Sequence, residues 1–338
     1  MTKRRRFRAW PSAPSSQPAL ESLTYAVALI CVEAGLFAPG HVLAGEILDA
    51  VLVLILLNVS RDPAPGRSGE RAATDAAMRA LALVALVRVV AAGLPLGDGS
   101  QALGTLVIAL LIVPTAIGIG YVASVPIFRL MALGPVRAPV LASAAGLVLG
   151  LAAYLFGAPR IWSTGAHGGG IALALAAATA AAAAEELMFR GVVQATFQRV
   201  VGRLGVVVAT ALFATTYLSA GSAGLVLVIA LAGAVFGYVV WRTSSLGVAI
   251  AGHVVLALSA GALWPELLSA DRGAWSHSPA ATILAAVALA GAAASVMRWS
   301  DPTSAAPAPP PEPARTPPVR TPPQVVAILA VARRLGLA

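Results

Sequence analysis

Long apolar stretches recur along the chain, and charged, proline and glycine residues gather in the shorter segments between them. A membrane-spanning helix needs about 20 apolar residues to cross about 30 Å of hydrocarbon. Ten segments approach this length, and the first, second and seventh of them are short or interrupted by charge. The ten are 22–38, 42–59, 76–95, 102–123, 138–156, 170–189, 205–220, 224–241, 245–264 and 280–297. The pattern predicts an all-α, polytopic transmembrane helical bundle with eight to ten spans.

Composition agrees with this class of protein. Hydrophobic residues make up 59% of the 338 residues and charged residues 11%, whereas soluble domains have about 45–50% and about 25%. The lipid bilayer is therefore the first expected partner of this chain. The sequence itself carries no signal for an oligomeric state.

The basic residues predict an orientation. With a cytoplasmic N-terminus and ten spans, the loops assigned to the outside hold only Arg160 and Arg272 among the basic residues. This asymmetry follows the positive-inside rule, so both termini are expected in the cytoplasm, in what looks like a bacterial plasma membrane. Topology also explains the net charge of +9. No nucleic-acid partner is expected, because no basic stripe is interleaved with aromatic residues.

Composition shifts divide the chain into four parts. A basic cytoplasmic lead precedes the first helices, and a proline-rich cytoplasmic tail, expected to be mostly disordered, follows the last. The four parts are the lead at 1–21, N-terminal membrane helices at 22–137, a second group of membrane helices at 138–297 and the tail at 298–338. The candidate chemistry lies in the second group of helices.

Four ionisable residues, Glu33, Glu46, Asp49 and Arg88, lie within the first three predicted spans. Such groups are costly inside a bilayer and by default suggest function. Mutual pairing, for example of Arg88 with a carboxylate, explains them as contacts between helices. A proton or ion path is the alternative, although the chain lacks the internal repeat or broken helix pair of transporters.

Adjacent carboxylates end the alanine-rich apolar segment 170–189. Glu186 precedes Arg190 by four residues, the favourable arrangement for an ion pair on one helix. Glu185 has no such partner on its own helix, which suits a general base. Small residues before the pair let neighbouring helices approach closely and bury it. Either catalysis or a polar contact at a helix end accounts for the pair.

His253 is the only histidine within a predicted span. A histidine in this setting is either a hydrogen-bonded packing residue or a catalyst. A zinc site needs three or four protein ligands, and this region offers His253 with Glu185 and a Glu186 expected to pair with Arg190. We therefore expect no metal and no cofactor.

Three stretches together resemble a known family. They are Glu-Glu-Leu-Met-Phe-Arg-Gly at 185–191, the apolar span that contains Phe213, and Trp241 to Leu246 leading into Gly252-His253. In order and spacing, residues 138–262 resemble the CPBP family of CAAX prenyl protease and bacteriocin-processing intramembrane endopeptidases, also called the Abi family. The resemblance implies that 138–297 is a CPBP-like membrane domain, which acts on a peptide or a membrane protein.

The resemblance also implies roles for particular residues. Members of the family use the first Glu of the pair with a His to activate water, and a second His with an Asn to stabilise the oxyanion. Carried over by position, Glu185 is the general base and His253 the oxyanion-side histidine. Glu186 and Arg190 are the structural ion pair.

Two positions depart from the family pattern. The second motif, Phe-x-x-x-His, reads Phe213-Ala-Thr-Thr-Tyr217 here, and the third, His-x-x-x-Asn or Asp, reads His253-Val-Val-Leu-Ala257. A phenol, with its ordinary pKa near about 10, donates a hydrogen bond but is a poor base, and Ala257 offers no donor to an oxyanion. Removing one oxyanion donor costs about 10²–10³ in rate, and losing general-base assistance costs about 10²–10⁴.

Three functions remain open on the sequence. The first is an intramembrane endopeptidase in which Glu185 activates water. The second is a catalytically degenerate relative that binds a partner peptide or helix, favoured by Tyr217 and Ala257. The third is a small transporter that uses the charges of the first three spans.

Overall fold

A computed structural model describes most of the predicted helices. It covers residues 17–37, 40–60, 69–93, 101–123, 127–131, 136–158, 168–218 and 222–268, with single positions at 125, 133, 284, 287, 289, 291 and 292. The lead before residue 17 and the tail at 298–338 lie outside the described residues. The division of the membrane helices at residue 137 stays a prediction.

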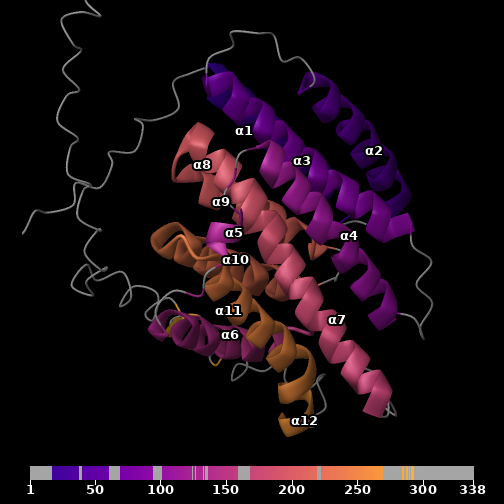
Figure 1. The fold of residues 1–338 in the computed structure, drawn as a ribbon. Coiled ribbons are helices and arrows are strands. Elements are labelled where there is room, and N and C mark those ends of the chain that lie inside the picture. The colour runs from indigo at the N-terminus through magenta and orange to yellow at the C-terminus, as the bar shows by residue number, and fades with distance from the viewer. Residues whose placement is uncertain are drawn as a thin grey trace, which may run out of the picture. The chain divides into compact units, whose positions relative to one another are not determined.

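All elements in this part of the chain are helices (Figure 1). The N-terminal group is α1 (Gln17–Val32), the π-helical η1 (Glu33–Phe37), α2 (Val42–Val59), α3 (Gly69–Gly93), α4 (Gln101–Val122) and α5 (Ile127–Leu130). The second group is α6 (Arg137–Leu155), α7 (Gly168–Glu186), the π-helical η2 (Leu187–Gln194), α8 (Ala195–Val201), α9 (Leu204–Thr215), α10 (Ala223–Thr243), α11 (Leu246–Leu258), the π-helical η4 (Ser259–Leu263) and α12 (Trp264–Leu268). The predicted all-α class is confirmed.

Seven helices in the described ranges are long and apolar enough to cross a membrane, slightly fewer than the eight to ten predicted. They coincide with seven of the ten predicted segments; two of the other three differ for physical reasons, and the third lies mostly outside the described part of the chain. The helix α9 has 12 residues and is only about 18 Å long. The helix α3 has 25 residues but carries five charged side chains. Segment 280–297 lies largely outside the described residues.

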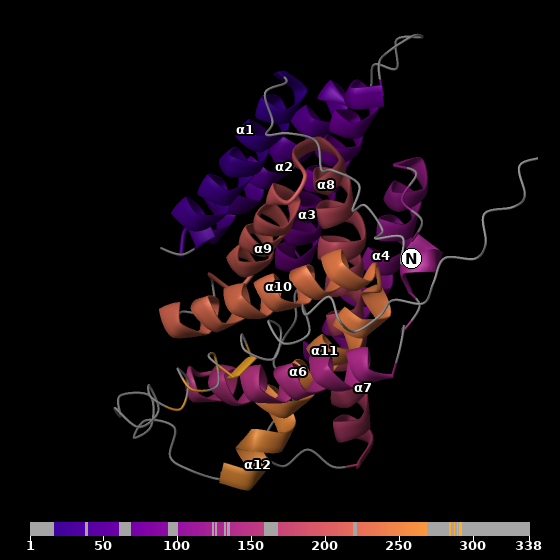
Figure 2. The same cartoon turned by 90° about the vertical axis from the view of Figure 1, so that its left-hand side faces the viewer.

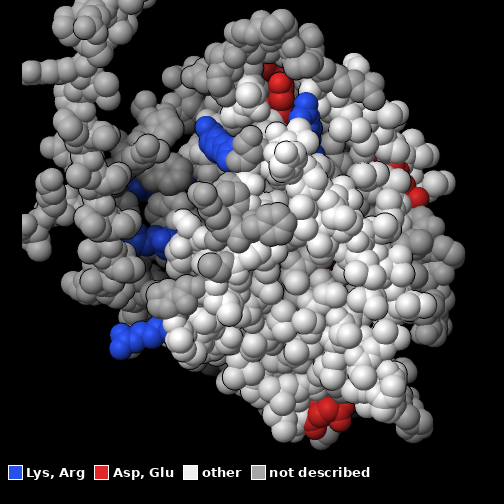
Figure 3. Space-filling model, viewed as in Figure 1, with Lys and Arg blue, Asp and Glu red and all other residues white. Residues whose placement is uncertain are grey.

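Burial separates the helices that face lipid from those that face protein. In the membrane-crossing parts of α2 and α4 only 22% of the residues are buried, whereas 61% are buried in the span from Leu246 to Leu268. The face of the molecule in Figure 3 is accordingly dominated by uncharged side chains, with few basic or acidic groups. Exposed apolar side chains on outer helices are what a hydrocarbon solvent requires. The chain is an integral membrane protein.

The charged helix α3 lies among other helices rather than against lipid. It packs against α1, α2, α4 and α8, and nearly every residue from Ala76 to Ala85 is buried. Figures 1 and 2 both show α1, α2 and α3 grouped together, away from α6 and α12. This position explains why α3 tolerates charges, because Arg79 and Arg88 reach protein groups instead of hydrocarbon.

Glycines bring α11 into backbone contact with α6. A Cβ atom on Gly252 would lie 2.8 Å from the Ala142 carbonyl oxygen and 2.6 Å from Phe236 Cε1, and a Cβ on Gly146 would collide with the Gly252 carbonyl. Such close approach is typical of small residues at helix interfaces in membranes. This close contact at Gly252 fixes how near His253, the next residue on α11, lies to α6.

Candidate active site

The two carboxylates lie where the regular helix ends. Glu185 and Glu186 are the last residues of α7, and the wider turns of η2 begin at Leu187. Every residue of η2 is buried. Segments of π-helix are rare and often occur at functional sites, where they change which way side chains point. The sequence pattern alone gives no sign of this change from α-helix to π-helix.

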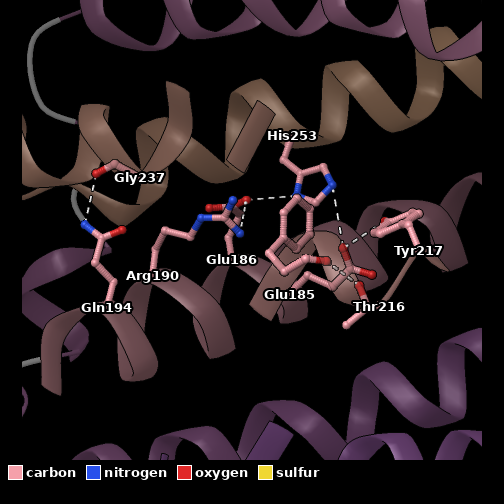
Figure 4. Close-up of polar contacts among 9 residues, drawn as sticks. Glu185, Glu186, Arg190, Gln194, Thr216, Tyr217, Gly237 and His253 are labelled. Carbon is pink, nitrogen blue, oxygen red and sulfur yellow. Dashed lines mark hydrogen bonds and ion pairs between the residues drawn. The ribbon is translucent and has the colours of Figure 1, made fainter. Parts of the chain in front are cut away.

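Glu186 binds two cationic or donor groups at once (Figure 4). Its Oε1 lies 3.2 Å from Arg190 Nη1, so the ion pair expected from the spacing is present. The same oxygen lies 2.9 Å from His253 Nδ1. Both Glu186 and Arg190 are essentially inaccessible to solvent. The Arg190 guanidinium also lies 4.3 Å from the centre of the Phe213 ring, a cation–π contact that supports a buried charge.

His253 is held by three contacts. Its ring stacks on Phe236 with centroids 5.9 Å apart and meets Phe213 edge-on at 5.5 Å. Because Nδ1 faces a carboxylate oxygen of Glu186, the tautomer with hydrogen on Nδ1 is the favourable one. That leaves Nε2 directed at Glu185, whose Oε2 lies 3.7 Å away. This distance is too long for a direct hydrogen bond.

Tyr217 reaches the same carboxylate from another element. It lies in the turn after α9, and its hydroxyl donates to Glu185 Oε2 at 3.2 Å. Its ring packs edge-on against Phe213 at 5.6 Å. The Glu185 side chain is 26% exposed, whereas that of Glu186 is fully buried. The two adjacent glutamates thus differ, with Glu186 enclosed by its partners and Glu185 accessible at one end of the constellation.

The candidate residues of the sequence therefore meet in one place, with one exception. Glu185, Glu186, Tyr217 and His253 are joined by the contacts above, and Arg190 and Phe213 support them. Ala257 lies one turn beyond His253 on α11 and brings only a methyl group. The altered third motif leaves this position without a hydrogen-bond donor.

Two contacts of the site were not predicted from the sequence. The first is the bond between Glu186 and His253, since the sequence predicts Glu186 only as the partner of Arg190. The second is the stacking of Phe236 of α10 on His253. Phe236 and His253 follow Glu186 by 50 and 67 residues. No local pattern relates positions so far apart.

Three of the four ionisable residues of the first three predicted spans, Glu33, Asp49 and Arg88, lie close to one another. Arg88 Nε lies 3.0 Å from Glu33 Oε2, so the expected pairing of Arg88 with a carboxylate is present. Asp49 is fully buried and lies within electrostatic range of Glu33 and Arg88. Glu46 is only partly buried. These contacts fit helix-to-helix pairing.

Replacing Glu186 by glutamine is expected to lower the free energy of unfolding by about 1.5–3 kcal/mol, the range for hydrogen bonds to charged groups. The substitution leaves the buried Arg190 without its counter-charge and lets an amide nitrogen face His253. Thermal unfolding of the purified protein in detergent measures the effect. The double variant with Arg190→Met removes both charges and should be less destabilised than Glu186→Gln alone. A single variant as stable as wild type would contradict this role.

Comparison with known proteins matches the segment that carries this site to one family model. Residues 167–259 match the family model described as type II CAAX prenyl endopeptidase Rce1-like. No curated protein matches the chain. No solved structure matches it either. The matched residues include Glu185, Tyr217 and His253. The segment that holds the site therefore matches the Rce1-like family, as the CPBP resemblance of the sequence predicts.

Proposed function

We propose that this protein is an intramembrane endopeptidase that hydrolyses a peptide or membrane-protein substrate with water activated by Glu185. The observation that carries the proposal is the position of Glu185 Oε2, between the Tyr217 hydroxyl at 3.2 Å and His253 Nε2 at 3.7 Å. A carboxylate oriented on one side and accessible on the other is suited to take a proton from water.

The gap between Glu185 and His253 suggests where that water binds. At 3.7 Å the two groups are too far apart for a direct hydrogen bond, and a water lying beside them can contact both. In the proposed reaction Glu185 takes a proton from this water, and the hydroxide attacks the carbonyl carbon of the scissile bond. When the tetrahedral intermediate collapses, the proton passes to the leaving amine. The products are one new carboxyl terminus and one new amino terminus.

Glu186 and His253 support the intermediate in this scheme. The carboxylate of Glu186 accepts from His253 Nδ1 at 2.9 Å, and a carboxylate partner of this kind stabilises a histidine that gains charge. In this scheme the proton that Glu185 takes from water passes to His253 Nε2, which donates to the oxyanion until the proton goes to the leaving amine. Tyr217, at the altered second-motif position, orients Glu185 by its hydrogen bond and does not act as a base.

We further propose that both termini lie in the cytoplasm of a bacterial plasma membrane. The support is the distribution of basic residues among the loops. In this orientation the sequence-predicted span 170–189, which carries Glu185, ends at the cytoplasmic side. The substrate bond would then be cleaved near the cytoplasmic side of the membrane.

Hydrolysis by the full-length protein in liposomes tests the proposal. The probes are a library of quenched fluorescent peptides and a farnesylated CAAX peptide, incubated in water enriched in oxygen-18. Peptide hydrolysis should place one heavy oxygen at each new carboxyl terminus, detected by mass spectrometry. Protein unfolded by heat before reconstitution is the blank. Absence of labelled product above that blank, for every probe, would overturn the proposal.

A second candidate function is a non-catalytic relative that binds a peptide or a partner helix at this site. Ala257 favours it, because an alanine at this position gives the oxyanion no donor. In that case the peptides would bind without being cleaved. Equilibrium binding of the same fluorescent peptides, measured by anisotropy alongside the labelled-water experiment, separates the two functions.

A further inference from the structure

Arg88 connects the N-terminal helices to the site. It lies on α3, well before the residues 167–259 that match the family. Its Nη1 donates to the carbonyl oxygen of Thr216 at 3.3 Å, and Thr216 is the residue before Tyr217. We propose that Arg88 is a positioning residue that holds the turn at Thr216 and so keeps the Tyr217 hydroxyl on Glu185; the proposal rests on the proposed function.

The turn that carries Tyr217 needs an external partner. The helix α9 ends at Thr215, and the amides of Thr216 and Tyr217 bond back to Phe213 and Ala214 at 3.3 and 3.1 Å. Carbonyls at a helix C-terminus have no partner within the helix, and the helix dipole makes this end negative. A guanidinium group satisfies both demands. The Arg88 bond therefore stabilises this turn in the one arrangement that the structure shows.

Arg88 is itself fixed from two sides. Its Nε donates to both carboxylate oxygens of Glu33, at 3.0 and 3.3 Å, and its guanidinium carbon lies 4.2 Å from the centre of the Phe37 ring. Glu33 is completely buried. A charge-assisted bond in such surroundings is roughly twice as strong as a neutral one. The π-helical η1, which supplies Glu33 and Phe37, thus sets the place of Arg88 and indirectly that of Tyr217.

The chain of contacts has three links, two between side chains and one from a side chain to a backbone carbonyl: Glu33 to Arg88, Tyr217 to Glu185, and Arg88 to the Thr216 carbonyl. It begins at the ion pair of Glu33 and Arg88, which the sequence predicts only as a contact between helices. It ends at Glu185, the proposed general base. The site is therefore incomplete without residues of the N-terminal group. A protein cut down to residues 167–259 would lack the support of its own Tyr217.

The test uses 3-fluorotyrosine incorporated at position 217 of the full-length protein and observed by fluorine NMR in detergent. Arg88→Gln should shift and broaden the signal, because the turn loses its partner and the phenol leaves Glu185. The matched control is Arg79→Gln. Arg79 lies on the same helix and also donates to a backbone carbonyl, that of Ser60 at 3.0 Å, but has no contact with the turn. A signal unchanged by Arg88→Gln, or changed equally by Arg79→Gln, overturns the proposal.

Kinetics give the second readout. Arg88→Gln in the otherwise natural chain should lower kcat about 10- to 100-fold, the cost of misplacing a reacting group by a fraction of an ångström to an ångström. KM should stay nearly constant, because substrate binding is not removed. Arg79→Gln should keep the wild-type kcat. A rise in KM with kcat constant contradicts the assignment of Arg88 to the positioning of Tyr217.

A conservative variant covers the case in which Arg88→Gln does not fold. Arg88→Lys keeps the charge, but one ammonium cannot reproduce the bonds to Glu33 and to Thr216 together. An intermediate fluorine shift and a smaller fall in kcat are expected. Wild-type values of both overturn the proposal. If the natural protein hydrolyses none of the peptides, the proposed function fails, while the fluorine signal still decides whether Arg88 positions residue 217.

Discussion

Replacing Glu185 by glutamine should lower kcat for peptide hydrolysis by about 10²–10⁴, the range attributed to general-base assistance. Glutamine keeps the size of the side chain and an oxygen that accepts from the Tyr217 hydroxyl, now 3.2 Å from Oε2. It cannot take a proton from water. The fold should persist, because Glu185 is partly exposed and Glu186, not Glu185, pairs with the buried Arg190. Initial rates with the most rapidly cleaved peptide measure the effect.

A matched variant shows whether the loss is local. Glu46 of α2 is also a glutamate in a membrane span, partly buried, and has no part in the site. Glu46→Gln should retain the wild-type rate and unfolding temperature. Equal activity of the Glu185→Gln and natural proteins would mean that another group activates the water. Equal loss in both variants would point to damage to the membrane fold instead of to the base.

The sequence predicts the local part of the site well. The ion pair between Glu186 and Arg190 follows from their spacing on one helix, and it is present at 3.2 Å. The apolar segments likewise predict the bounds of α2, α4, α6 and α10 to within two residues, because a span is defined by continuous local composition. Segment 205–220 differs, since its helix ends at Thr215 and the chain turns there to present Tyr217.

The contacts between distant segments are what the sequence does not contain. The bond of His253 to Glu186 joins positions 67 residues apart, and that of Arg88 to Thr216 joins positions 128 apart. Periodicity and spacing describe one helix at a time, whereas these bonds depend on how helices cross. The resemblance to a family relates Glu185 to His253, but it leaves Arg88 outside, because α3 precedes the resembling residues 138–262.

The two altered motif positions can be changed together. Tyr217→His with Ala257→Asn restores the family's residue types at both places, and it is expected to raise kcat by about 10²–10³, the value of one oxyanion donor. Asparagine one helical turn beyond His253 lies on the same side of α11, so its amide can donate to the oxyanion that His253 faces. The histidine supplies a group that can exchange protons near neutral pH.

The single variants separate the two contributions. Ala257→Asn alone should carry most of the gain, because it adds a donor and removes no contact that the structure contains. Tyr217→His alone should lose activity, since it breaks the bond to Glu185 that Arg88 helps to hold. The control Ala251→Asn makes the same change on α11, two residues before His253. Side chains two residues apart on a helix point in different directions, so this asparagine points away from the oxyanion.

The starting rate decides what a gain would mean. If the natural chain already cleaves peptides, faster turnover in the double variant identifies a slow enzyme whose oxyanion is poorly stabilised. If the natural chain only binds peptides and the double variant hydrolyses them, the natural protein is a binding protein. It then retains the general base Glu185 but lacks the family's residues at positions 217 and 257. No gain from Ala257→Asn, with an intact fold and bound peptide, would contradict the position assigned to the oxyanion. Since Ala257→Asn leaves Glu185 and its bond to the Tyr217 hydroxyl unchanged, this single variant isolates the stabilisation of the intermediate from the activation of water.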